Sequence, residues 1–403
     1  MALTGVQIPS GAYWCSPFAR WQGSLSHLHS VEFAAHVARR ALAGRGIPLE
    51  ALDYGLLGIT VPQRGVFYGL PWLTGLMGAD HIPGPTISQA CATSARVMAQ
   101  ASQEIGSGLA HAALAVTTDR ISNGPDIYYP NPKGPGGAGT RENWVLDNFR
   151  KDPYAGCDML STAENCARRW GVSTQEQHEV VLKRYAQYQD ALADDSAFLK
   201  RFMTLPFEVP DARFRKTVCT LDGDEGIHPT TAEGLADLEP LQDDGTVTFG
   251  GQTHPADGTA GMVITSAERA PELSRDKHIA IKLLSFGQAR VEKAFMPSAP
   301  IPAARQALEA ADLDIKHISA IKSHNPFAVN DIIFARETGV DLAGMNNFGC
   351  SLIWGHPQGP TGMRAIIELI EELIISGGGY GLFNGCAAGD TAMAIVLEVT
   401  DRS

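Results

Sequence analysis

The 403-residue sequence lacks a cysteine framework, a surplus of basic residues and a long apolar run. Its seven cysteines are scattered and none forms a Cys-x-x-Cys pair, so neither a disulfide scaffold nor a metal site is expected. The net charge of −12 argues against a nucleic-acid partner, which requires a basic footprint. No apolar stretch is long enough to span a membrane and no signal peptide precedes the first expected strand. We therefore expect a cytoplasmic protein in a reducing compartment, with no membrane partner.

Three short segments rich in small residues carry the chemistry that the sequence offers. They are residues 88–95 with Cys91, residues 355–364 with His356, and residues 384–390 with Cys386. Helix formers follow Cys91 up to a Gly-Ser-Gly stop, which places this cysteine near the first turn of a helix. A helix N-terminus and a nearby imidazole both favour a nucleophilic thiolate.

Cys91 alone could equally be a small buried packing residue. His356 favours the interpretation of Cys91 as a nucleophile. This histidine lies between Gly355 and Pro357 in a glycine-rich loop that is too irregular for a core histidine. Cys386 is expected just after a glycine-rich strand, and the small residues that follow it leave backbone N–H groups accessible for an oxyanion hole. Together the segments indicate acyl transfer on a cysteine.

These motifs resemble those of the thiolase superfamily. The Cys91 segment resembles the family's nucleophile motif, residues 355–364 its GHPxGxxGxR motif, and Cys386 its second catalytic cysteine. The segment His324-Asn325-Pro326-Phe327 resembles the histidine form of a further motif, as in sterol-carrier-protein-linked thiolases and their bacterial relatives. Further matches run from residues 16–20 to residues 395–398, so the resemblance covers essentially the whole chain.

The resemblance implies an α/β fold of duplicated thiolase type, with two layered halves and a lid-like insertion. The expected N-terminal half comprises residues 1–120 and 250–270, and the C-terminal half residues 271–403. Both halves show a strand–helix–strand rhythm around their cysteine or histidine segment. Residues 121–249 form the expected insertion, with its own helices at 160–169 and at 174–192, the latter capped by Ser173. The insertion is interpreted as a coenzyme A-binding lid; the alternative is an excursion that stabilises a dimer.

The implied activity is reversible thiolytic cleavage or Claisen condensation of 3-oxoacyl-CoA. His356 would accept the proton of Cys91, whose sulfur then carries the acyl group, while Cys386 moves the proton on the α-carbon. One oxyanion hole would use His356 and His324, and the other the backbone N–H groups of Cys91 and Ala388. Taken alone, His324 could be an ordinary hydrogen-bonded structural histidine. No cofactor is expected, since the coenzyme A thioester is the substrate.

A third group of residues is expected to bind the substrate. An acidic chain needs a local basic patch to hold phosphates, and the densest one in the insertion is Arg213, Arg215 and Lys216. The alternative is a solvated face paired with nearby aspartates. The other candidates are Met159, His228, Thr253 and Trp354.

The chain departs from the family pattern near the substrate. Residues 386–390 read Cys-Ala-Ala-Gly-Asp where the family has CxGxG, and Trp354 stands where small residues are usual. These changes indicate altered acyl specificity, with a bulky or aromatic acyl group as one possibility, and they leave the role of Asp390 open.

A homodimer or homotetramer is expected, with residues 112–116 as an apolar strand edge for pairing. Two alternatives remain. One is another condensing enzyme of the same fold, although such enzymes lack a second catalytic cysteine and the 355–364 motif. The other is a thiolase-fold subunit that depends on a small zinc-bearing OB-fold partner.

Overall fold

The structure, a computed structural model, describes residues 2–401. The helices are α1 (Ser30–Gly44), α2 (Leu70–Met77), α3 (Thr93–Gly106), α4 (Leu146–Arg150), α5 (Met159–Trp170), α6 (Thr174–Lys200), α7 (Ala232–Ala236), α8 (Ala270–Leu273), α9 (Pro300–Ala310), α10 (Ala328–Thr338), α11 (Ser351–Trp354) and α12 (Gly359–Ile375). The strands are β1 (Val6–Ile8), β2 (Tyr13–Cys15), β3 (Ala19–Arg20), β4 (Tyr54–Gly58), β5 (Thr86–Ile87), β6 (Ala112–Arg120), β7 (Asp126–Tyr129), β8 (Thr140–Asn143), β9 (Phe207–Pro210), β10 (Thr217–Leu221), β11 (Ala256–Ser266), β12 (Ile279–Arg290), β13 (Ile318–His324), β14 (Gly378–Ala387) and β15 (Thr391–Asp401). Among residues 2–401, no helix combines the length and apolar character that a membrane crossing requires.

Eleven of the strands form the main sheet, whose two similar halves are joined through β1. Their order is β13-β14-β15-β12-β1-β11-β6-β4-β5, and β2 and β3 also pair with β11. β1 is antiparallel to both β11 and β12, so this short strand connects the two halves. Each half carries its parallel pairs at the outer end, β4 with β5 and β6 in one and β13 with β14 in the other.

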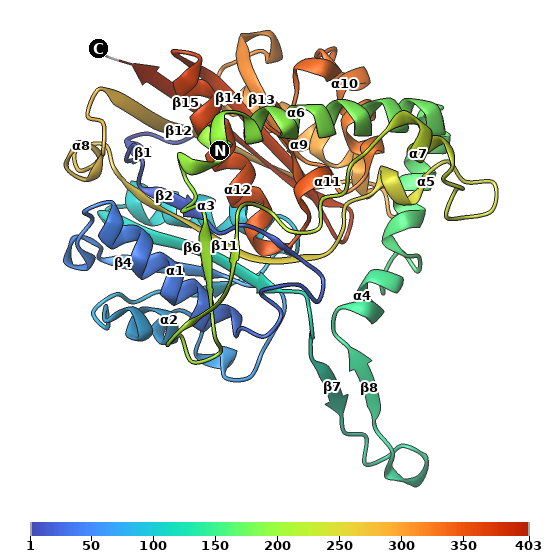
Figure 1. The fold of residues 1–403 in the computed structure, drawn as a ribbon, viewed down its shortest axis with the longest axis horizontal. Coiled ribbons are helices and arrows are strands. Elements are labelled where there is room, and N and C mark those ends of the chain that lie inside the picture. Colours follow the sequence, from blue (N-terminus) through green and yellow to red (C-terminus); the bar gives the residue numbers. More distant parts are fainter. Residues whose placement is uncertain (1, 402–403) are drawn as a thin grey trace.

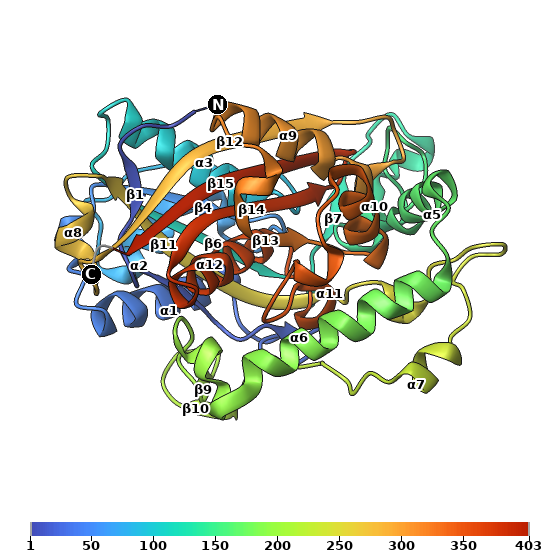
Figure 2. The same cartoon turned by 90° about the horizontal axis from the view of Figure 1, so that it is seen from above.

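Alternation along β6 shows how the layers stack. Leu114 and Val116 pack in one apolar cluster with α1 and α2, whereas Ala113 and Ala115 pack in the other with α3. Helices α3 and α12 contact each other and also strands of both halves, so they form a central layer. Helix α9 packs on β12, β14 and β15 from the outside of the C-terminal half. The expected α/β fold with two layered halves is therefore confirmed (Figures 1 and 2).

The pairing of β6 corrects the expectation that residues 112–116 form an exposed strand edge. Residues 112–116 belong to β6, which is hydrogen-bonded to β11 on one side and to β4 on the other. All five residues are buried inside the sheet, so they offer no edge for a partner subunit. The exposed end of this half is β5 instead.

Residues 121–249 add no strand to the main sheet. The hairpin of β7 and β8 projects away from the body of the molecule (Figure 1). Helix α6 runs along the outside of the structure, with the β9–β10 hairpin near one end and α7 near the other (Figure 2). Its expected cap is confirmed, because Ser173 and Glu176 form a capping box. The α6 residues Ala193–Ser196 have non-helical backbone angles.

A buried ionic cluster ties this segment to the central helix α12. The Arg364 guanidinium donates to both carboxylate oxygens of Asp224, at 2.5 and 2.8 Å. Glu368 joins Arg364 to Lys322 on β13, with N–O distances of 2.9 and 3.1 Å. Tyr188 on α6 donates its hydroxyl to Asp224. All four charged side chains are shielded from solvent, so each charge depends on these partners.

Candidate active site

Cys91 lies at the turn between β5 and α3. The backbone of Ala90 has a left-handed φ of 43°, and the Thr93 hydroxyl donates to the Ala90 carbonyl at 2.7 Å. A non-glycine residue in this conformation is strained and is held by its surroundings. Ala92 occupies the N-cap position of helix α3, so the expected position of Cys91 beside a helix N-terminus is confirmed.

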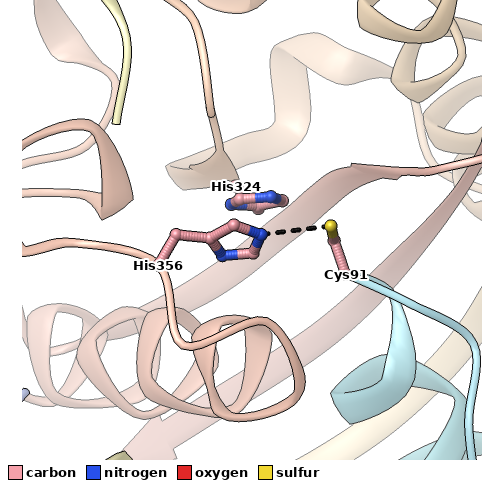
Figure 3. A group of neighbouring side chains, drawn as sticks. All are labelled: Cys91, His324 and His356. Atoms are coloured by element: carbon pink, nitrogen blue, oxygen red, sulfur yellow. Dashed lines mark hydrogen bonds between the residues drawn. The ribbon is translucent and has the colours of Figure 1, made fainter. Parts of the chain in front are cut away.

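His356 faces the Cys91 thiol. Its Nε2 atom lies 3.1 Å from the Cys91 sulfur, and its Nδ1 atom lies 2.6 Å from the hydroxyl oxygen of Thr361 (Figure 3). The backbone N–H of His356 donates to the carbonyl of His254 at 2.9 Å. The imidazole is therefore held at both ring nitrogens and at the main chain.

Both members of this pair are neutral in the resting site. Burial raises the pKa of Cys91 to about 12, although the N–H groups of Ala388 and of Cys91 itself donate to the sulfur and lower it. Burial lowers the pKa of His356 to about 3. A thiol faces a neutral imidazole near pH 7, so the proton must move as the sulfur attacks.

His324 lies on top of His356. The two rings are stacked, with centroids 4.1 Å apart and an interplanar angle of 28° (Figure 3). The Nδ1 atom of His324 lies 2.9 Å from the Ser351 hydroxyl, whereas its buried Nε2 atom has no hydrogen-bond partner within residues 2–401. Burial lowers its pKa well below the usual value, so His324 is also neutral. An unpaired buried ring nitrogen is costly unless a ligand atom reaches it.

Cys91, His324 and His356 bring their sulfur and ring nitrogens within 4.8 Å of one another, a composition that could hold zinc. The ring geometry opposes this, because imidazole lone pairs lie in the ring plane and two stacked planes do not converge on one ion. The cluster is better suited to moving a proton and polarising a carbonyl oxygen.

Cys386 approaches the site from the C-terminal half. It lies inside β14, one residue before the strand ends, and not after the strand as expected. Its sulfur accepts a hydrogen bond from the Asn330 side chain at 3.3 Å. Burial raises its pKa well above the usual value, and the Cys91 sulfur raises it further.

Asp390 accepts hydrogen bonds from three backbone N–H groups. One carboxylate oxygen accepts the backbone N–H of Ala294 at 2.9 Å and the other accepts that of Phe295 at 3.0 Å. The Asp390 carbonyl accepts the N–H of Val291 at 2.9 Å. Asp390 therefore fastens the loop after β12 to the β14–β15 turn.

A cavity of about 490 Å³ lies behind the His356 loop. Its wall is largely apolar and includes Leu235, Phe249 and Leu352. Two of the expected substrate-binding residues, Thr253 and His228, line it. His254, which bonds the His356 backbone, is also in its wall, so the cavity adjoins the catalytic loop.

The other expected substrate-binding residues lie elsewhere. Trp354 is fully buried, with its ring 5.4 Å from Phe18 and against the Arg364 guanidinium, and it does not line the cavity. Met159 begins α5 and packs on the main apolar cluster. Arg213, Arg215 and Lys216 occupy the turn between β9 and β10, outside the cavity lining. Phosphate binding by these three remains a prediction.

The sequence did not single out three side chains that support the site: Thr361, Ser351 and Asn330. Thr361 was visible only as part of the 355–364 motif, and Asn330 lies six residues after His324. Thr361 lies only five residues from its partner His356. The partners of Ser351 and Asn330 lie on other elements, 27 and 56 residues away, so no local pattern marks these two.

Comparison with known proteins identifies the family to which the chain is similar. Residues 13–268 match the thiolase N-terminal domain and residues 277–399 the thiolase C-terminal domain. The chain is 30% identical over 401 residues to a beta-ketoadipyl-CoA thiolase of Pseudomonas aeruginosa, covering 95% of this chain and 96% of that protein. It is 29% identical to an acetyl-CoA acetyltransferase of Allochromatium vinosum, over 95% of this chain and 96% of the relative.

The crystal structure of human mitochondrial 3-ketoacyl-CoA thiolase superposes with a TM-score of 0.89 at 25% identity, covering 98% of this chain and 99% of that one. The same enzyme in complex with CoA gives a TM-score of 0.88, over 99% of both chains at 25% identity. Sequence and fold match over nearly the full length, and the chain belongs to the thiolase family.

Proposed function

We propose that this chain is an acyl-CoA C-acyltransferase that cleaves or forms 3-oxoacyl-CoA through an acyl group carried on Cys91. The observation that carries the proposal is the 3.1 Å contact between the Cys91 sulfur and His356 Nε2, at a sulfur that also receives the N–H of Ala388. A neutral base and donors at one sulfur are the parts that acyl transfer on a thiol requires.

The first half-reaction uses Cys91 and His356. As the sulfur bonds to the acyl carbon, the thiol proton passes to Nε2 of His356, and Thr361 at Nδ1 stabilises the imidazolium that forms. The N–H groups of Cys91 and Ala388, which point at the Cys91 sulfur in the resting site, are the proposed donors to the oxygen of the thioester once the acyl group is bound there. His324 is the proposed donor to the other, together with His356. This role requires the Ser351 hydroxyl, which also lies 3.1 Å from Asn325 Oδ1, to give its one proton to Nδ1 of His324, so that Nε2 carries the ring proton.

Cys386 acts on the α-carbon. In cleavage, the carbon–carbon bond breaks and the Cys386 thiol protonates the departing carbanion. CoA-SH then takes the acyl group from Cys91: the CoA thiol proton restores Cys386, and His356 returns its proton to the freed Cys91 sulfur. In synthesis, the Cys386 thiolate removes the α-proton and the carbanion attacks the acyl-Cys91 carbonyl; the carbon–sulfur bond to Cys91 then breaks, and the freed sulfur takes up the proton that Cys386 had collected. Asp390 is a poor alternative acid, because both of its carboxylate oxygens are occupied by backbone N–H groups.

Coenzyme A is the proposed occupant of the cavity behind the His356 loop, with no further cofactor. The apolar wall suits the pantetheine chain, while Thr253 and His228 supply polar groups. We assign this binding role to the inserted part, residues 121–249, and propose two thiolase halves, one of residues 1–120 with 250–270 and the other of residues 271–403. His324 stacked on His356 supports a relationship to the sterol-carrier-protein-linked type. The replaced residues after Cys386 favour a bulky or aromatic acyl group.

A homodimer or homotetramer is the proposed assembly, in the cytoplasm, where the seven free cysteines would stay reduced. β5 ends the sheet next to Cys91, and its Thr86 is exposed. The projecting β7–β8 hairpin exposes Tyr128 and Tyr129, although an isolated two-stranded hairpin is only marginally stable in water. Light scattering at micromolar concentration tests the proposed oligomer, and a monomer would contradict it.

Activity that appears only when a zinc-bearing OB-fold protein co-purifies would favour the alternative that this chain is a dependent subunit.

The deciding experiment is mass spectrometry of the protein after mixing with a panel of linear, branched and aromatic 3-oxoacyl-CoAs. We expect one acyl mass on the peptide that contains Cys91, and its size identifies the substrate class. The Cys91→Ala variant is the control. Acyl mass on another residue, or on none with any substrate, would overturn the proposal.

A further inference from the structure

Asn330 is the third residue of α10, and its side chain bridges the start of this helix to Cys386. Its Nδ2 group donates to the Cys386 sulfur at 3.3 Å, while its Oδ1 atom accepts the backbone N–H of Phe327 at 3.2 Å. Because the oxygen is occupied by a donor, the amide nitrogen must be the atom that faces the sulfur. The orientation of the carboxamide is therefore determined by its own contacts.

The sulfur that receives this bond lies in a place unfavourable to charge. Cys386 is fully buried, and burial raises its pKa well above the usual value. The sulfurs of Cys91 and Cys166 are the titratable groups that raise the pKa further, whereas the Asn330 hydrogen bond lowers it. A thiolate formed at this position needs a donor that is already in place.

We propose that Asn330 is a positioning residue for the carbon–carbon step, which aims the Cys386 sulfur and donates an N–H to it while it holds negative charge. This inference rests on the proposed role of Cys386 as the acid and base at the α-carbon.

The packing of α10 against its neighbours does not explain why a carboxamide stands at position 330. The adjacent Asp331 anchors the helix, accepting hydrogen bonds from Arg184, Ser323, Asn325 and Asn346. Arg184 and Asp331 form a fully buried ion pair at 2.9 Å. Asp331, and not Asn330, therefore makes the contacts that hold α10 in place. The Asn330 amide N–H donates to the Cys386 sulfur instead.

The test measures two steps separately in the intact protein: acylation of Cys91, and exchange of the α-protons of acetyl-CoA with deuterated water. Asn330→Leu removes both hydrogen bonds, while Asn330→Asp keeps an oxygen for Phe327 but offers no amide N–H. We expect both variants to lose exchange by about ten- to a hundredfold, with acylation nearly unchanged, because a hydrogen bond to a charged group has this strength. The pH at which exchange sets in should also rise, since loss of the donor disfavours the thiolate.

Two further variants, Asn346→Ala and Cys386→Ala, separate a loss of stability from a loss of the proton-transfer step. Asn346→Ala removes a buried carboxamide from the Asp331 anchor without touching Cys386, so it should lower thermal stability but leave the pH profile of exchange in place. Equal loss of exchange in Asn346→Ala and Asn330→Leu, with no pH shift in either, would overturn the proposal. So would wild-type exchange in both Asn330 variants while Cys386→Ala has none. Normal exchange in Cys386→Ala would instead remove the proposed role of Cys386 itself.

Discussion

The hydroxyl oxygen of Thr361 lies 2.6 Å from Nδ1 of His356, at the ring nitrogen that does not face Cys91. The two residues are five positions apart, on a loop and the first turn of the helix that follows it. Thr361 therefore sets the direction in which Nε2 points. A base that must collect a proton during attack is sensitive to such an orientation.

Thr361→Val should lower kcat for acylation by about ten- to a hundredfold with little change in KM, because the ring loses its orientation but the substrate contacts remain. Stopped-flow release of CoA from acetyl-CoA measures this step. Thr74→Val is a matched control, since this buried threonine on α2 bonds only to backbone carbonyls. Equal losses in the two variants would assign the effect to stability.

Cys91 should show no reactive thiolate at neutral pH. Its pKa of about 12 lies above the usual range and that of His356, about 3, lies below, so both groups stay neutral from about pH 5 to about pH 9. Alkylation of Cys91 by iodoacetamide should therefore rise about tenfold per pH unit across this range, without a plateau. Peptide mass spectrometry follows the rate, with the exposed Cys219 as internal comparison. A plateau below about pH 7 would indicate a thiolate–imidazolium pair instead.

The two cysteines should separate the two half-reactions. Cys91→Ala should abolish acyl-enzyme formation, because this is the sulfur beside His356. Cys386→Ala should still form the acyl-enzyme but lose carbon–carbon bond formation by at least about a hundredfold. Acyl transfer and condensation are followed in the same samples. Condensation that survives in Cys386→Ala would mean that another group moves the α-proton.

Two sets of substitutions locate the phosphates of coenzyme A. Replacing Arg213, Arg215 and Lys216 by glutamine should raise KM and make it less dependent on salt while kcat stays near the wild-type value, if the basic cluster holds them. His228→Gln should raise KM about two- to fivefold, because His228 lines the cavity. A rise in the second variant alone would place the phosphates at the cavity mouth.

Sequence patterns predicted the parts of this molecule that are encoded locally. The helix after Cys91, the capped start of α6 at Ser173, and the glycine-rich loop of His356 all depend on residues close together in the chain. Motif order then placed both cysteines and both histidines around one site.

Long-range contacts account for what could not be predicted. Strand composition did not reveal that β6 is paired on both sides. The identity of Trp354 did not reveal that its ring packs on Arg364, away from the cavity. Likewise, the helix setting of Cys91 suggested an easily formed thiolate, but desolvation by distant segments outweighs that local effect.

The contact between Asp224 and Arg364 constrains how far the inserted part can behave as a separate module. Hinging it away, or deleting it, would leave the buried Arg364 guanidinium with Glu368 as its remaining carboxylate partner. Loss of a partner from a buried ion pair costs up to about 3–5 kcal/mol, so this separation is unfavourable. Residues 121–249 and the catalytic core should therefore melt in a single cooperative transition, and a protease cut in the exposed β7–β8 turn should leave both fragments associated.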